Sequence, residues 1–180
     1  MNFSYFCTNF REKKMRITIK NIIVVAMLCI VSVAYSQSAN YYMQKAKKGD
    51  PTAQMFLALC YQQGKGVEKN DSLAVYWLER SSRQGLSESQ VLLGHCYREG
   101  RGVKADSTKA FELYENASWS ESSLSFDALG DCYYYGIGTT RDVIRSRYYY
   151  SKAAKRGYKK SKLKYEKIRF KKDEDAVIDL

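Results

Sequence analysis

Proline and histidine are almost absent from this sequence, which contains one of each in 180 residues. Because linkers between domains are usually rich in proline, we expect a single domain. Metal centres and acid–base catalysis need His, Cys, Asp or Glu at ligand spacing, or a nucleophile beside a base. The only histidine, His95, is not part of such a cluster, and the Gly-x-Gly turns lack the lysine of a phosphate loop. We therefore expect no catalytic residue, no metal and no cofactor.

Long hydrophobic runs are also scarce, and the run at 22–35 is too short for a membrane span. It has 14 uncharged residues, whereas a spanning helix needs about 20. Basic residues precede it and small residues, Ala34 and Ser36, end it, which is typical of a signal peptide. We predict a signal peptide at 1–36. Translation that starts at Met15 would make this signal more compact. The signal predicts export to the periplasm, cell surface or secreted space. The alternative is an uncleaved anchor that tethers the protein to a membrane.

Positive charge is concentrated near the C-terminus. Residues 141–172 contain 14 lysines and arginines against two acidic residues, whereas 37–140 contain 11 basic and 12 acidic residues. Tyrosines lie among these cations as in nucleic-acid patches, but export argues against a nucleic-acid partner. We expect either a solvated helix face or a surface that binds phospholipid, lipopolysaccharide or wall polymers. The candidate residues for binding such anionic surfaces are Lys155, Arg156, Lys159, Lys160, Lys162, Lys164 and Lys167.

A motif recurs every 36 residues through the rest of the chain. It reads LALCYQQGKGV at 57–67, LGHCYREGRGV at 93–103 and LGDCYYYGIGT at 129–139. Self-similarity of this kind is typical of repeat proteins, in which stacked units share one core. We predict a solenoid at 37–172 with units at about 50–85, 86–121 and 122–157. A mobile acidic tail is expected at 173–180.

Each unit is predicted to contain two helices joined by a glycine turn. Asp50 before Pro51 is an N-cap, and Ser87 with Gln90 forms a capping box at the same place in the next unit. The first helix ends at Gly64 or its equivalent, where glycine can adopt the left-handed conformation. The second helices are capped by the residues at one shared repeat position, Asn70, Asp106 and Asp142.

The ends and one junction depart from the regular unit. Residues 40–49 align with a second helix, and the capping helix at 158–172 aligns with a first helix, so half repeats close both ends and eight helices are expected. At the junction between the second and third units, Glu121 replaces the glycine found at Gly85 and Gly157. We expect Trp119 to fill a differently shaped gap there.

Small residues and cysteines occupy fixed repeat positions. Ala58, Gly94 and Gly130 leave room for helices to approach closely. The cysteines Cys60, Cys96 and Cys132 share one position. Equivalent residues in neighbouring helix pairs are separated by about 10 Å, which is too far for a disulfide. We therefore predict three buried free thiols.

The chain resembles the Sel-1-like repeat family over about residues 40–170. The resemblance rests on the pattern Leu-x-x-Cys-Tyr-x-x-Gly-x-Gly-Val, which is followed by Asn70 or Asp106 and then by Ala74 or Ala110. This family is related to the tetratricopeptide repeats. The third unit departs from its pattern at Thr139 and Ser146. The resemblance implies an all-α fold, a right-handed α-solenoid of about three 36-residue helix-pair repeats with half-repeat caps. It also implies a protein-binding scaffold and no catalytic residue.

A candidate groove follows from the first helices, which line the inner curve of tetratricopeptide-like solenoids. Its stripe changes from apolar through mixed to acidic, which suits a peptide or helix with an apolar and a basic part; the alternative is an ordinary solvated face. The candidate partner-binding residues are Met55, Leu59, Gln62, Val91, His95, Arg98, Asp127, Asp131 and Tyr134.

The functional hypothesis is a nonenzymatic scaffold or adaptor in the bacterial envelope or secreted space that binds an unidentified protein or peptide. The alternative is a cationic module that binds an anionic membrane or wall surface through its C-terminal helices. A small cell-wall-related hydrolase is the third and least favoured hypothesis, because no residue pattern supports it.

Overall fold

The computed structural model describes residue 27 and residues 36–178, with side chains as far as residue 168. This part of the chain is helical and contains no strand. After a helix at 36–47 come α2 (Pro51–Gln63), α3 (Asp71–Arg83), α4 (Ser87–Glu99), α5 (Ser107–Ser118), α6 (Ser123–Tyr135), α7 (Val143–Lys155) and α8 (Lys159–Ile178). None of the described helices is long and apolar enough to cross a membrane.

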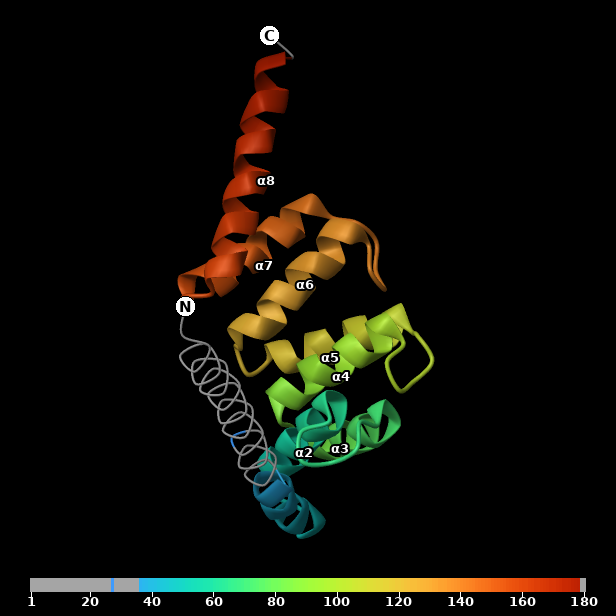
Figure 1. Cartoon of the computed structure of the whole chain (residues 1–180). Helices are drawn as coiled ribbons and strands as arrows, with labels where there is room; N and C mark the ends of the chain where they lie inside the picture. The colour runs from blue at the N-terminus through green and yellow to red at the C-terminus, as the bar shows by residue number, and fades with distance from the viewer. Residues whose placement is uncertain (1–26, 28–35, 179–180) are drawn as a thin grey trace, which may run out of the picture.

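The helices form three stacked pairs, α2/α3, α4/α5 and α6/α7, with α8 packed against α7 (Figure 1). Each second helix also contacts the first helix of the next pair. The predicted all-α solenoid with a half repeat at each end is therefore confirmed. α8 is longer than the capping helix predicted at 158–172, because it continues to Ile178 through most of the predicted acidic tail. The predicted signal peptide lies outside the described residues except for Met27 and Ser36.

Most of the predicted helix caps form. The carboxylate of Asp50 accepts a hydrogen bond from the backbone N–H of Ala53 at 2.9 Å. Side chains at the second-helix position cap α3, α5 and α7 in the same way, at Asn70, Asp106 and Asp142. The capping box predicted at Ser87 is wrong. α4 begins one residue earlier than that motif requires, with Leu86 at the N-cap, and the Ser87 hydroxyl donates to Glu88 instead.

A glycine in each of the last two units lets the tyrosine of the second helix pack against the first helix. A Cβ at Gly94 would overlap the ring of Tyr114, and a Cβ at Gly130 would overlap the ring of Tyr150. The same positions in the first unit hold Ala58 and Leu78, both fully buried. The larger second-helix residue therefore occurs where the first helix has no side chain.

The hydroxyls of these buried tyrosines are hydrogen-bonded to the polar residues that directly follow the glycines. The hydroxyl of Tyr114 is hydrogen-bonded to Nδ1 of His95 at 2.9 Å, and that of Tyr150 donates to Asp131 at 2.6 Å. A buried hydroxyl needs such a partner, since leaving it unpaired costs about 1–3 kcal/mol. The first unit has no tyrosine at this position and correspondingly has Leu59 in place of a polar partner.

The junction between α5 and α6 differs from its prediction. Trp119 is 88% exposed, so the expectation that it fills a gap is wrong. Glu121 replaces the glycine of other units but adopts the same left-handed backbone, with φ of 55°. Its side chain forms an ion pair with Arg156 at 2.5 Å, which joins the α5–α6 junction to the α7–α8 junction. The backbone turn is kept without glycine, and the indole remains in solvent.

Ser146 occupies the position where the other units have the buried alanines Ala74 and Ala110. Among the described residues, its hydroxyl is the one buried side-chain polar atom without a hydrogen-bond partner. Because an unpaired buried hydroxyl is unfavourable, Ser146→Ala should raise the free energy of unfolding by about 1 kcal/mol. Urea denaturation of the variant and the wild type measures this change. Ser161→Ala is the control, since the Ser161 hydroxyl is paired with Asp127, and it should not stabilise.

Candidate functional site

The first helices lie side by side and form one continuous face of the solenoid. The amide of Gln62 on α2 donates to the sulfur of Cys96 on α4 at 3.2 Å. Lys164 on α8 donates to Asp131 on α6 at 2.7 Å. α4 and α6 are also in contact. The second helices α3, α5 and α7 pack on the other side, so the first helices present a surface of their own.

The predicted groove residues do not all lie on this surface. Val91 is 3% exposed and belongs to the core, so it offers no surface to a partner. Gln62 faces α4, His95 is bonded to Tyr114, and Asp127 and Asp131 are bonded to α8. The remaining four are partly exposed, Met55, Leu59, Arg98 and Tyr134. The predicted stripe therefore runs partly along the contacts between neighbouring first helices.

Relative to the predicted stripe, the most exposed side of the first helices is rotated toward the positions of residues 52, 56, 59 and 63. We call this surface the inner face. Its members in successive first helices are Thr52, Phe56, Leu59 and Gln63; Glu88, Leu92, His95 and Glu99; Leu124, Asp131 and Tyr135; and Lys160 and Lys167. The residues at position 59 in the three units are half-buried, namely Leu59, His95 and Asp131. The sequence contained a signal for this rotation. The small residues Ala53 and Ala58 mark the buried side of α2, and these positions lie on the opposite side of the helix.

Large apolar side chains remain exposed on the inner face. Phe56 is 38% exposed and stacks on Tyr42 with ring centroids 5.0 Å apart, which holds it in place. Leu124 is 41% exposed and Tyr135 is 68% exposed. Sequence reasoning missed these three residues. The second helices also expose apolar side chains, for example Tyr76 and Tyr148, so exposure alone does not distinguish the inner face.

The acidic end of the predicted groove is neutralised within the chain. Nζ of Lys164 lies 3.0 Å from Asp127 and 2.7 Å from Asp131. Burial alone would lower the pKa of Lys164, but its bonds to the two carboxylates outweigh this and raise it. Burial lowers the pKa of His95, which favours its neutral form. The carboxylates that seemed available to a basic partner already hold a lysine.

The basic residues predicted to bind anionic surfaces fall into two groups, those that form ion pairs within the described part of the chain and those that do not. Arg156 pairs with Glu121, and Lys164 pairs with the two aspartates. The other five are exposed, and within the described residues they form no ion pair, namely Lys155, Lys159, Lys160, Lys162 and Lys167. These five cations are available to an external anion.

The three cysteines among the described residues are free, as predicted, but they are not equally buried. Cys96 and Cys132 are buried, whereas Cys60 is half-buried. Burial raises the pKa of all three thiols, and that of Cys132 to about 12. Within the part of the chain that the structure describes, no group of three His, Cys, Asp or Glu side chains could hold a metal ion. The arrangement supports buried packing residues and not a reactive centre.

This difference predicts the order in which the described thiols react. Because the thiolate is the reactive form, Cys60 should be alkylated by iodoacetamide at neutral pH well before Cys96 and Cys132. Peptide mass spectrometry after timed labelling of the native protein measures each site. All three should react at similar rates in denaturant, which serves as the control. Faster native labelling of Cys132 than of Cys60 would contradict the packing described above.

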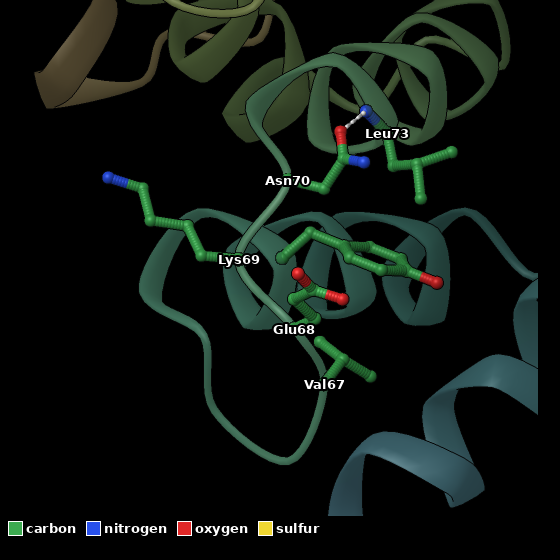
Figure 2. Close-up of a pocket in the computed structure, with 6 residues that line it drawn as sticks. Val67, Glu68, Lys69, Asn70 and Leu73 are labelled. Atoms are coloured by element: carbon green, nitrogen blue, oxygen red, sulfur yellow. Dashed lines mark hydrogen bonds between the residues drawn. The ribbon is translucent and has the colours of Figure 1, made fainter.

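A pocket of about 410 Å³ lies at the turn between α2 and α3 (Figure 2). Tyr61, Leu73 and residues 67–70 line it, and Asn70 accepts the capping bond from the N–H of Leu73. In the next unit, Lys109 replaces Leu73 and lies 4.3 Å from the ring of the equivalent Tyr97. The six residues that line the pocket include no histidine, cysteine, serine or threonine.

Comparison with known proteins places these features in a family. The Sel1 repeat pattern matches residues 51–86, 87–118 and 128–158. The unmatched stretch 119–127 begins at the irregular junction with Trp119. A Sel1 repeat protein from Oxalobacter formigenes is 36% identical, with a TM-score of 0.63 over 70% of this chain and 95% of that one. A comparison with functionally curated proteins found no match.

Two further solved structures are similar. A protective antigen of uropathogenic Escherichia coli strains, with an SLR fold, is 34% identical with a TM-score of 0.66 over 68% of this chain. This chain spans about a quarter of that antigen, 26% of its length. Helicobacter pylori cysteine rich protein B shares the fold at 21% identity, with a TM-score of 0.57 over 73% of this chain and 94% of that one. Sel1 repeat proteins generally mediate protein–protein interactions and act as non-catalytic scaffolds. The three matched repeats and the shared helix-pair stack show that this chain belongs to the Sel1 repeat family.

Proposed function

We propose that this protein is a nonenzymatic scaffold that acts in the bacterial envelope or secreted space and binds a partner protein on its inner face. The observation that supports this most is the set of partly exposed apolar side chains on that face, chiefly Phe56, Leu124 and Tyr135. Burying such side chains contributes about 25 cal/mol per Å² of apolar surface. The location follows from the predicted signal peptide.

The aromatic side chains of the inner face are suited to binding a partner protein. Aromatic residues are enriched among the side chains that dominate binding energy, because they bury a large area with few rotatable bonds. Phe56 is already ordered by its stack on Tyr42, so little further freedom is lost on binding. Phe56 therefore offers a binding partner an apolar side chain that is already held in place.

The test is a cross-linked pull-down from an envelope extract at low and high salt. The variant Phe56→Glu/Leu124→Glu should lose a salt-resistant partner that the wild type retains. A matched control is Tyr76→Glu/Val143→Glu, which changes residues of similar exposure on second helices and should retain it. Replacement of His95 and Asp131 is less suitable, because it would leave the hydroxyls of two buried tyrosines unpaired. Loss of the partner with the control but not with the inner-face variant would overturn the proposal.

An anionic surface is a second candidate, and one observation favours it. Trp119 is 88% exposed and lies two residues before Glu121, which pairs with Arg156 at the α7–α8 junction; within the described residues, Lys155 and Lys159 at that junction form no ion pair. Tryptophan and lysine together are typical of membrane interfaces. Sedimentation with phosphatidylglycerol vesicles should then be salt-sensitive and weaker for Trp119→Ala. The hydrolase hypothesis gains no support, because His95 bonds a buried tyrosine.

A further inference from the structure

The inner face ends in lysines supplied by α8. In the 36-residue register, Lys160 corresponds to Leu124, and Lys167 corresponds to Asp131. Both lysines are exposed, and within the described residues neither forms an ion pair. The helix that pairs with α6 through Lys164 thus places two exposed cations on the surface proposed above to bind a partner.

The neighbouring carboxylates do not offset these cations. Asp127 and Asp131 are 14% and 21% exposed and share Lys164, whose ammonium group lies within 3.0 Å of both. At this end of the inner face, three lysines therefore face two carboxylates. The stripe that the sequence suggested would be acidic is, with α8 in place, positively charged.

The other parts of the inner face carry no comparable charge. In the middle, Glu99 is bonded to Arg98 at 2.9 Å and to Arg101 at 2.8 Å. The first unit contributes apolar side chains, Phe56 and Leu59. Going from α2 to α8, the face changes from apolar through balanced charge to cationic.

We infer that the partner of the inner face is a protein segment with an apolar residue for the α2 end and acidic residues for Lys160 and Lys167. This inference rests on the proposed function and specifies the charge of the partner. Neighbouring helices are about 9 Å apart, so α2 and α8 are separated by about 27 Å. An extended segment of about eight residues, at about 3.3 Å per residue, spans that distance.

Selection from a random dodecapeptide phage library on the purified full chain tests the inference. Selected peptides should be enriched in Asp and Glu at one end and in apolar residues at the other. The selected peptide should bind Lys160→Glu/Lys167→Glu about tenfold more weakly, because two favourable exposed charge contacts become repulsive. Lys155→Glu/Lys162→Glu is the matched control, since it changes the net charge equally away from the inner face and should alter the affinity less than about twofold.

Each other outcome overturns a defined part of the account. Neutral or basic selected peptides that still require Phe56 and Leu124 would overturn the acidic partner and leave the scaffold standing. Peptides that bind the Phe56→Glu/Leu124→Glu variant unchanged, or no selected peptide at all, would contradict the inner face itself. An equal loss of peptide affinity in Lys160→Glu/Lys167→Glu and in Lys155→Glu/Lys162→Glu would show that the peptide is held by nonspecific charge attraction. If only phosphatidylglycerol vesicles depend on Lys160 and Lys167, a lipid surface is the occupant and the inference fails.

Discussion

Gly94→Ala is expected to destabilise the protein by about 2 kcal/mol, although alanine normally favours a helix. The helix preference alone would stabilise by about 1 kcal/mol. The added methyl group, however, would overlap the ring of Tyr114, which is fully buried and cannot move aside. Overpacking of this kind costs about 3 kcal/mol and so exceeds the gain. Chemical denaturation monitored by circular dichroism measures the difference.

A second substitution tests whether the lost stability of Gly94→Ala comes from the clash with Tyr114 or from the changed helix preference alone. In a His95→Leu background, Gly94→Ala/Tyr114→Leu recreates the Ala58, Leu59 and Leu78 combination of the first unit, so it should be more stable than Gly94→Ala in the same background. The coupling energy of the two changes should exceed about 1 kcal/mol, as for residues in direct contact. Additive effects of the two substitutions would show that the glycine and the tyrosine are not packed against each other.

Lys164→Met is expected to release α8 from the helix stack. It removes the cation that pairs with Asp127 and Asp131 and leaves two neighbouring carboxylates without a counterion. Breaking a fully buried pair costs about 3–5 kcal/mol, and the partial exposure here reduces the expected loss to about 2 kcal/mol. Hydrogen exchange should show faster exchange in α8 and unchanged exchange in α2 and α3.

The control for the lost stability of Lys164→Met removes the two carboxylates that this variant leaves without a counterion. Asp127→Asn/Asp131→Asn in the Lys164→Met background should slow exchange in α8 again. In the wild type, the raised pKa of Lys164 means that the pair stabilises the fold from neutral pH to about pH 10 and that this contribution is lost as pH rises through the raised value. Unchanged exchange in Lys164→Met would show that apolar packing alone holds α8.

The fold was predictable because the same local rules act in every unit. Asp50 and its second-helix counterparts cap helices with their own neighbours, and Gly64 ends a helix by its own conformation. These effects depend on residues close in the chain, so a 36-residue repeat reveals them. The Ser87–Gln90 motif gives the wrong start for α4, because the 36-residue register that aligns Asp50 with Leu86 places the N-cap one residue earlier.

The site was less predictable because it depends on contacts between units. The stripe containing Val91 was chosen from helix periodicity, without the neighbouring first helix that buries one side of it. The charge of the surface was assigned within each unit, but Lys164 reaches Asp131 from 33 residues away. Trp119 occupies the repeat position of Arg83 and Lys155, which are also exposed, and the left-handed Glu121 keeps the turn that glycine makes in the other units.

The most direct test of the central claim is site-specific photo-cross-linking in living cells. Benzoylphenylalanine would replace either Phe56 or Tyr135 on the inner face, or Tyr76 or Tyr148 on the second helices, all exposed aromatic residues. We predict that both inner-face positions cross-link the same protein and that the second-helix positions do not. A cross-linked partner at Tyr76 or Tyr148, with none at Phe56 and Tyr135, would show that the protein binds through its opposite side.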